Sequence, residues 1–179
     1  MASTYSNTGI ELIADGEQSG TWGQTTNLNW QIAEELATGV ISIALSATTY
    51  TLTTSDGALS NGRHAVIVFT GSPGGTCTVT VSPNDMQKVY WIVNSSDEDV
   101  EISQGSGANV TIVAGGKKIV YCDGAGSGAA VVDLLEDVVV DLLASEWAID
   151  GTKVTATAAD LNGAATTGKA IAMSIVFGG

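Results

Sequence analysis

Residues 40–123 are a succession of short apolar runs separated by turn residues. VISIAL, TYTLTT and TCTVTV alternate apolar with small or polar side chains, a period of two that indicates β-strands with one buried face. HAVIVFTG is an almost continuous apolar run, as expected of a strand that is buried on both faces. About eight such strands, separated by glycine, proline, asparagine and aspartate, predict a mainly β protein built as an antiparallel β-sandwich or jelly roll.

Two other stretches have the periodicity of a helix. In residues 27–38, Leu28, Ile32 and Leu36 recur every four residues and form one apolar stripe, and Gly39 is a typical helix terminator. Three polar residues could cap the first turn: Thr25, Thr26 or Asn27. We therefore predict a short N-terminal helix at this position.

The second predicted helix covers residues 131–146, VVDLLEDVVVDLLASE. Its aspartates recur every four residues and would form one charged, solvent-exposed stripe: Asp133, Asp137 and Asp141. Repulsion among them would raise the pKa of their carboxyl groups. Its apolar residues have the spacing of a short coiled-coil seam, which predicts an oligomer interface: Leu135, Val138 and Leu142.

These elements divide the chain into three parts. Residues 1–39 are an extended N-terminal arm followed by a helix, residues 40–130 are the β domain, and residues 131–179 are a helix with a short C-terminal β tail that would support oligomerisation. The first 24 residues are polar and are interrupted by glycines, so we expect them to become ordered against a partner. The alternative is a loop packed on its own domain.

The charge balance argues against two classes of partner. Nineteen Asp and Glu against six Lys and Arg give a net charge of −13, which repels both phosphate backbones and anionic membranes. No apolar run approaches the roughly 18 residues of a membrane span, and the first residues lack the basic and apolar parts of a signal peptide. We therefore expect no nucleic-acid partner and no membrane partner.

The residues that carry catalysis or bind metals are scarce. The chain has one His and one Arg, no G-x-S-x-G nucleophile motif, and no Cys or His spacing typical of a zinc site. We therefore expect no enzyme, no cofactor and no resident metal. Two weaker possibilities stay open. A dinucleotide-binding pattern is formed, before the second predicted helix, by Gly124, Gly126 and Ala129. An acidic turn could bind Ca²⁺ through Asp97, Asp99 and Glu101.

The N-terminal segment NTGIELIADGEQSGTWGQTTNLNW carries a distinctive pattern, G-[IL]-x-L-x-x-x-G-x-x-x-G-x-W-G-x-x-T-N. It is formed by Gly9, Leu12, Gly16, Gly20, Trp22, Gly23, Thr26 and Asn27. This segment resembles the start of virion structural and fibre proteins of tailed phages, of the marine and cyanobacterial type. The strands NGRHAVIVFTG, KVYWIVN and GKKIVYCDG resemble the β domain that follows it in such proteins, so the resemblance spans roughly residues 8–133.

The resemblance implies a non-enzymatic virion structural protein, assembled in the bacterial host cytoplasm. It would be a capsid decoration protein, a head fibre or a short fibre component, and the chain leaves no room for a receptor-binding or polysaccharide-cleaving domain. The alternatives are a tail-fibre anchor or adaptor and, in another class, a carbohydrate-binding β-sandwich module. The expected partners are other virion proteins, on capsid or tail, and further copies of the chain in a homotrimer.

We assign attachment to the particle to the large apolar residues of the arm and first helix: Ile10, Leu12, Trp22 and Trp30. Tryptophans could also stack sugars, but the four in this chain are spread over different predicted elements. The two cysteines, Cys77 and Cys122, are expected to be reduced, because phage particles assemble in a reducing cytosol. The strand pattern leaves open whether they are neighbours in a sheet.

Overall fold

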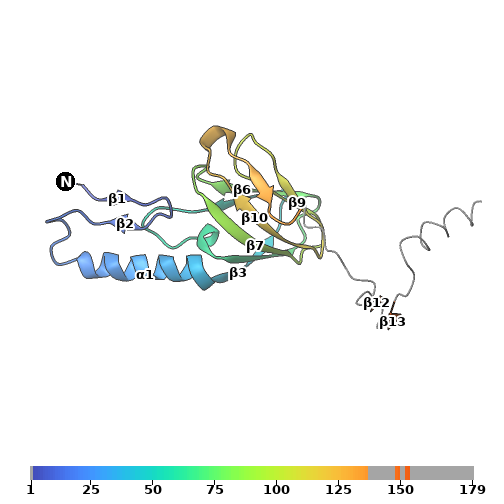
Figure 1. Cartoon of the computed structure of the whole chain (residues 1–179), viewed down its shortest axis with the longest axis horizontal. Helices are drawn as coiled ribbons and strands as arrows, with labels where there is room; N and C mark the ends of the chain where they lie inside the picture. Colours follow the sequence, from blue (N-terminus) through green and yellow to red (C-terminus); the bar gives the residue numbers. More distant parts are fainter. Residues whose placement is uncertain (1, 137–147, 150–151, 154–179) are drawn as a thin grey trace, which may run out of the picture. The chain divides into compact units, whose positions relative to one another are not determined.

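The computed structural model describes residues 2–136, 148–149 and 152–153. The chain divides into two units, Met1–Asp137 and Val138–Gly179. In the second unit, β12 (Ala148–Ile149) and β13 (Thr152–Lys153) form an antiparallel pair. The first unit is mainly β, as predicted, and the described residues include one α-helix (Figure 1). No helix in the described part of the chain is long and apolar enough to cross a membrane.

Two sheets form the body of the first unit. The five-stranded sheet has the order β11-β10-β7-β5-β3. Its strands are β3 (Val40–Leu45), β5 (Val66–Gly71), β7 (Lys88–Asn94), β10 (Lys117–Cys122) and β11 (Val131–Asp133). The four-stranded sheet has the order β4-β6-β8-β9. Its strands are β4 (Thr49–Thr53), β6 (Cys77–Ser82), β8 (Val100–Ser103) and β9 (Val110–Ile112).

The sheets are mixed, so the prediction of a purely antiparallel sandwich is wrong. β3, β5 and β7 run parallel to one another, as do β4, β6 and β8. Within these two sheets, antiparallel pairing is confined to β7–β10, β10–β11 and β8–β9. The cause lies in the connections, because each turn between β3 and β8 carries the chain from one sheet to the other. Alternate strands therefore share a sheet and a direction.

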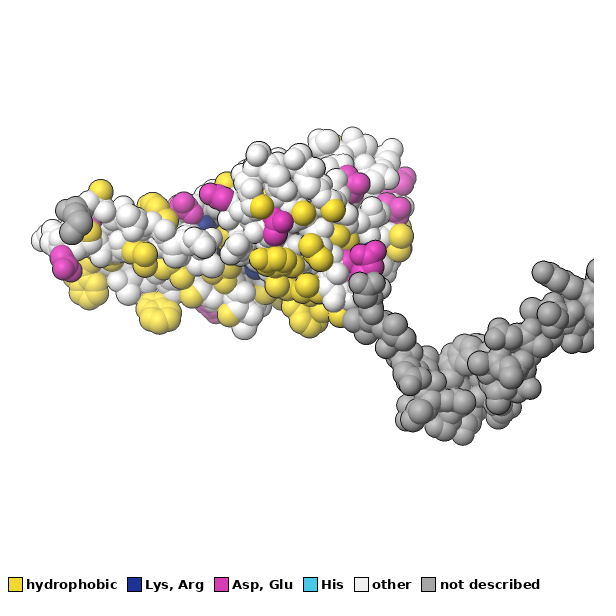
Figure 2. All heavy atoms as spheres, turned by 45° about the horizontal axis from the view of Figure 1, so that its top comes forward, with side chains coloured by type: hydrophobic (Ala, Val, Ile, Leu, Met, Phe, Trp, Pro, Cys, Tyr) yellow, Lys and Arg dark blue, Asp and Glu magenta, His cyan; other side chains and the backbone are white. Residues whose placement is uncertain are grey.

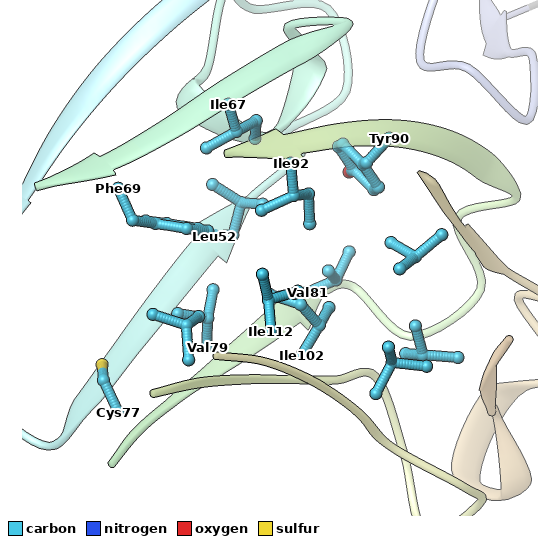
Figure 3. Close-up of a cluster of buried hydrophobic side chains, with 14 of the residues drawn as sticks. Leu52, Ile67, Phe69, Cys77, Val79, Val81, Tyr90, Ile92, Ile102 and Ile112 are labelled. Carbon is cyan, nitrogen blue, oxygen red and sulfur yellow. The ribbon is translucent and has the colours of Figure 1, made fainter. Parts of the chain in front are cut away.

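The core lies between the two sheets and is built as the alternation predicts. Phe69, Ile92, Leu52 and Ile102 are buried, and Figure 3 shows them projecting into the space between the strands. The predicted apolar side of β6 is confirmed, since it buries Cys77, Val79 and Val81. In β5 the inward residues are buried and the outward valines are only half-buried, so this chain covers one face of that strand.

The two cysteines are free and buried. Cys77 begins β6 in the four-stranded sheet, whereas Cys122 ends β10 in the five-stranded sheet. They are therefore not neighbours in a sheet. Burial raises the pKa of the Cys122 thiol to about 12, with a further contribution from Asp123, so this group stays protonated at neutral pH.

The N-terminal helix α1 (Trp22–Thr38) is longer than predicted. The predicted stripe is confirmed, because Ile32 is buried and Leu28 and Leu36 are half-buried on the packed side. Gly39 ends the helix, and its N–H donates to Glu35 O at 3.1 Å. The start was placed too late: the N-cap residue is Thr21, which makes no side-chain capping bond, and the three predicted capping residues lie inside the helix.

A small hairpin lies beside α1 (Figure 1). It consists of β1 (Thr4–Tyr5) and β2 (Glu11–Leu12), paired antiparallel. Asn29 of α1 fastens the helix to it by two bonds to Glu11: its Nδ2 donates to the backbone oxygen at 2.8 Å, and its Oδ1 accepts from the backbone N–H at 2.9 Å. The amide group of Asn29 thus makes the two hydrogen bonds that a residue of a neighbouring strand would make to Glu11.

The helix predicted over residues 131–146 is wrong where the structure describes it. Val131–Asp133 form strand β11, which pairs with β10, and a turn follows through Glu136. The N–H of Val131 also donates to Ala108 O at 2.8 Å. Adjacent β-branched valines favour a strand over a helix, and the sheet edge supplies their hydrogen bonds. The remaining aspartates and interface residues of that prediction lie outside the described residues: Asp137, Asp141, Val138 and Leu142.

Candidate functional site: two exposed apolar surfaces

The four residues assigned to attachment lie on the hairpin and on α1. Trp22 and Trp30 are 62% and 71% exposed, and Leu12 is also exposed. Because residues four and eight apart share a helix face, the two indoles lie on the same side of α1, about 12 Å apart along its axis. Trp30 and Ile10 line one shallow hollow between α1 and the hairpin. We call Ile10, Leu12, Trp22 and Trp30 the helix surface.

Arg63, to which no sequence pattern assigned a role, connects this N-terminal segment to the body formed by the two sheets. It lies in the 3₁₀ turn η1 (Asn61–Arg63), and its side chain is completely buried. Its guanidinium donates to three backbone oxygens: Thr8 O, Ser55 O and, at 3.2 Å, Ala58 O. Burial lowers its pKa, while Asp56, 3.8 Å away, raises it. One side chain therefore joins the hairpin loop to the loop after β4.

The first glycine of the N-terminal pattern is placed against that arginine. Gly9 has a φ of +71°, and a Cβ added to it would collide with the guanidinium group of Arg63. Gly9 O also accepts from Gly57 N–H at 2.9 Å. Gly16 and Gly20 have φ values of +81° and +84°, which ordinary residues rarely adopt. The glycines of the pattern thus shape the turns that bring the hairpin to the body and to α1. The hydrogen bonds of Thr8 and Gly9 to the body agree with the alternative interpretation, in which the N-terminal segment packs on its own domain.

A second apolar surface covers the outer side of the five-stranded sheet. The strand register aligns one uninterrupted apolar row across four strands and the turn after β11: Val40, Val66, Trp91, Ile119 and Leu134. A neighbouring row contains Val89, Tyr121 and Val132. Trp91, at the centre, is 57% exposed. Figure 2 shows hydrophobic side chains exposed both along the N-terminal helix and on the β-body. We call these two rows the outer face.

Leu135, one of the three predicted oligomer-interface residues, is exposed beside the outer face. It lines a shallow hollow together with Val66, Trp91 and Ile119. The structure therefore brings Leu135 to the tryptophan of β7, whereas the sequence prediction placed it in a helical seam. The period of three and four in this stretch was misleading, because its first residues form a strand.

The acidic turn after β7 uses its carboxylates within the protein. Asp97 accepts from Ser72 Oγ at 2.8 Å, Asp99 accepts from the N–H of Ala114 at 3.0 Å, and a side-chain amide donates to Glu101 at 3.1 Å. Across the described residues, no group of three or more His, Cys, Asp or Glu is arranged to hold a metal ion. These carboxylates stabilise their own loops, and the geometry gives no support to Ca²⁺ binding.

The glycine-rich segment GAGSGA is a compact turn. Residues Gly126–Gly128 form the 3₁₀ turn η2, and β11 follows it in place of the predicted helix. Two backbone N–H groups that could have faced a phosphate instead donate to Asp123 Oδ1, those of Ala125 and Ala130, both at 3.0 Å. A dinucleotide site needs a helix N-terminus with free N–H groups at this position, so the residues present do not fit one.

The single histidine lies near an acid. His64 Nε2 is 3.8 Å from Glu35 Oε1, beside a hollow between α1 and β3. Thr38, which supplies the hydroxyl in the lining of that hollow, donates to Glu34 O at 3.3 Å. Its Oγ is therefore directed back to its own helix, and no activated nucleophile faces the His64–Glu35 pair in the described lining.

Charged groups lie on the inner side of the five-stranded sheet. Asp133 accepts from Lys118 Nζ at 2.8 Å, and this bond lowers the pKa of Asp133, with a further contribution from the N–H of Leu135. The prediction that repulsion raises the pKa of Asp133 is therefore wrong. Burial lowers the pKa of Lys88 to about 8, and its Nζ lies 4.6 Å from the centroid of the Tyr90 ring.

Comparison with known proteins adds nothing to this geometry, because no family model, curated protein or solved structure matches the chain. The two apolar surfaces are the principal features of the described residues that suggest a role. Neither offers the convergent polar groups that usually orient a small ligand. Both are typical of surfaces that contact another protein.

Proposed function

We propose that the chain is a non-enzymatic structural protein of a tailed-phage virion, a capsid decoration protein, head fibre or short fibre component. It attaches to the particle through the helix surface. The observation that carries this proposal is the exposure of two indole rings on one face of α1. Tryptophan is the residue most enriched among side chains that dominate protein interfaces, because it contributes a large apolar area with few rotatable bonds.

The way the helix surface is supported favours binding by a preformed site. Arg63 fixes the hairpin loop to the β-body, and Asn29 fixes α1 to the hairpin. The tryptophans therefore project from a regular helix whose position is set by hydrogen bonds. A surface held in this way loses less conformational entropy on binding than a flexible arm does. The N-terminal pattern thus combines glycines that shape the support with tryptophans that make the contact.

The two alternatives differ in what meets the tryptophans. A tail-fibre anchor or adaptor would use the same helix surface and carry a second protein elsewhere. A carbohydrate-binding module would stack sugar rings on aromatic side chains, but Trp91 lies on β7 and Trp22 and Trp30 lie on α1. The described tryptophans therefore do not form one common platform, which favours the protein interface.

The test is a binding experiment with particles assembled without this chain. Full-length protein is added, bound and free fractions are separated by sedimentation, and electron microscopy locates the bound protein on capsid, neck or tail. Trp22→Ser combined with Trp30→Ser should weaken binding at least about 30-fold, the effect of losing one interface hot spot of about 2 kcal/mol. The matched control is Val113→Ser, because Val113 is exposed to a similar degree just after β9.

Three outcomes would contradict the proposal. The double variant could bind particles as well as the unchanged protein does. The Val113 control could lose binding equally, which would indicate a nonspecific effect of surface hydrophobicity. Thirdly, the isolated protein could bind glycans through Trp22 and Trp30 without binding particles, and the carbohydrate-binding alternative would then replace this one.

A further inference from the structure

Strand β3 lies at one edge of the five-stranded sheet, with only one side paired. The N–H of Val66 donates to Gly39 O at 3.0 Å, and this bond determines which residues of β3 direct their backbone groups to β5 in the parallel ladder. In such a ladder the backbone groups of alternate residues point to opposite sides. Those of Ile41 and Ile43 therefore point to β5, and those of Val40, Ser42 and Ala44 point away from the sheet. In the described residues no strand pairs with this second side.

This edge lacks the features that usually protect a free strand. Protected edges carry charged side chains, proline, a bulge or a covering loop. Residues 36–55 contain no charged residue and no proline, and all of β3 and β4 lie within them. Val40 is 63% exposed, and Ser42 and Ala44 are exposed as well. The outward side of β3 is therefore an accessible row of donors and acceptors.

The distribution of charge determines which partners can approach the free edge of β3. A chain with a net charge of −13 repels its own copies wherever its acids lie near the contact. Residues 36–55 carry no charged side chain, so this repulsion is small along β3. A second copy therefore meets less repulsion along β3 than along the acidic loops. Val40 also ends the apolar row of the outer face, so a strand added here would extend that row.

The other free edge, β4, is less suited to the same role. Its outward residues are Thr49, Thr51 and Thr53, because the N–H of Thr78 donates to Thr48 O at 2.9 Å and sets the phase of that ladder. The turn η1 closes over its far end, where a Cβ on Gly62 would lie 2.7 Å from Thr53 O. A partner strand could not pair along the whole of β4, whereas on β3 the outward residues Val40, Ser42 and Ala44 are all exposed in the described part of the chain.

We propose that β3 is a homotypic pairing edge, to which β3 of a second copy adds in antiparallel orientation. Ser42 lies opposite Ser42 of the second copy, and Val40 lies opposite Ala44. Each of these pairs exchanges both of its backbone N–H···O bonds, so every outward group of β3 is satisfied. The pairing is two-fold symmetric and joins the two five-stranded sheets; a trimer would need a different contact. This inference rests on the edge alone and is independent of the attachment to a particle.

The first experiment measures the mass of the full-length protein in solution by sedimentation at micromolar concentration. The expected species is twice 18.1 kDa. Ser42→Pro removes one outward N–H and leaves the bonds to β5 in place, because proline is tolerated on the free side of an edge strand. This variant should be monomeric at concentrations at which Ser42→Ala, which keeps the N–H, is still a dimer. Circular dichroism checks that both variants are folded.

The second experiment tests the register by oxidative cross-linking, and it does not depend on the proline variant folding. In the proposed pair the Cα atoms of the two Ser42 residues are about 5.5 Å apart, a distance that suits a disulfide. The two Ala44 residues are offset by four positions, roughly 13 Å at the rise of a strand. Ser42→Cys should therefore give covalent dimers and Ala44→Cys should not, while Cys77 and Cys122 are buried and serve as an internal background.

Four results would overturn the proposal. The unchanged protein could be a monomer. Ser42→Pro could keep the mass of the unchanged protein while remaining folded. Ser42→Cys could fail to cross-link in a species of doubled mass, which would mean that the copies meet elsewhere or that another segment occupies the edge. Finally, Ser42→Cys and Ala44→Cys could cross-link equally, which would indicate random collision.

Discussion

The two faces of the five-stranded sheet are both apolar, yet only one is covered. On the inner face, Ile67, Phe69 and Ile92 lie against the four-stranded sheet and are at most 1% exposed. On the outer face an equally apolar row includes Val40 and Trp91, both more than half exposed. The apolar content of this sheet therefore exceeds what the chain buries for itself, which is typical of a surface that contacts a partner.

The charged residues sharpen this contrast. Lys88, Lys118 and Asp133 occupy inner-face positions of the sheet, since they lie opposite Cys122, Ile92 and Val120 in the register. The central row of the outer face has no charged residue. Charges therefore lie at the rim of the core while valine, tryptophan and isoleucine face outward. An outward row without charges is difficult to explain in an isolated soluble chain and is expected of a surface that meets a partner.

The largest effect should come from the inner face. Phe69→Ala removes a completely buried ring between the sheets and should lower the free energy of unfolding by about 3–5 kcal/mol, because the cavity cannot fully collapse. Trp91→Thr removes an even larger side chain from the outer face and should change the stability of the folded chain by less than about 0.5 kcal/mol. Urea unfolding measures both values. Equal losses would mean that the outer face is also buried within the single chain.

Substitutions of Arg63 test whether the N-terminal segment contributes to the stability of the folded body, as the inner face does. Arg63→Ala leaves three backbone oxygens without their donor and should lower the free energy of unfolding by about 2–4 kcal/mol. Arg63→Lys should recover little of the loss, because an ammonium group cannot reproduce the fork of donors. Removing residues 2–24 should also destabilise the body, since Arg63 would lose Thr8 O. Unfolding midpoints that stay unchanged in all three proteins would show that these bonds contribute nothing.

These contacts show which parts of the fold a sequence can reveal. The period of two located Val79 and Val81 in the core, and the period of four located Ile32, because burial on one face leaves a local pattern. Strand direction left no such pattern, since parallel and antiparallel strands alternate in the same way. The burial of Arg63 depends on carbonyl groups of residues 8, 55 and 58, and the first of these lies 55 positions away in the sequence. No local pattern could have predicted it.

The candidate surfaces divide in the same way. The pattern placed Trp22 and Trp30 in the attachment region, and the structure shows both exposed on one side of α1. The sequence pattern does not predict the outer face, because each strand contributes a single residue to its row. The register that aligns these residues cannot be derived from the sequence of any one strand. The stretch beginning at Val131 was predicted as a helix because its spacing suits that period as well as a strand. The edge of β10 decided between them.

Lys88 is the inner-face charge with the larger expected effect on stability. Because burial lowers its pKa to about 8 from 10.5, the folded state holds this proton less tightly than the unfolded state does. The charged form therefore opposes folding at neutral pH, and Lys88→Met should raise the free energy of unfolding by about 1–3 kcal/mol at pH 7. That advantage should shrink by about 1 kcal/mol between pH 7 and 9, as Lys88 of the unchanged protein loses its proton in the folded state.

The measurement for Lys88 is urea unfolding of both proteins at pH 7, 8 and 9. Both proteins contain the same two thiols, so the contribution of the thiols to the pH dependence cancels in the difference between the two free energies of unfolding. An advantage of Lys88→Met that stays constant across this range would mean that the buried amine keeps its ordinary pKa. A variant that is less stable than the unchanged protein at pH 7 would mean that the contact of Lys88 with the Tyr90 ring outweighs its burial.

The smallest effect should come from the ion pair at the rim of the inner face. Asp133→Asn keeps an oxygen for the N–H of Leu135 and removes the charge that faces Lys118, so the loss should be about 0.2–1 kcal/mol for a partly exposed pair. Because the folded pKa of Asp133 is lowered, its contribution is fully present above the unfolded pKa of about 3.9 and is lost as pH falls through the folded pKa. The difference between the two proteins should therefore be constant from pH 5 to 8 and should vanish in stronger acid. Asp133→Asn could instead be the more stable protein at pH 7, with an advantage that disappears towards pH 5. Repulsion from neighbouring acids would then dominate at Asp133, and the ion pair with Lys118 would not be what holds β11 against β10.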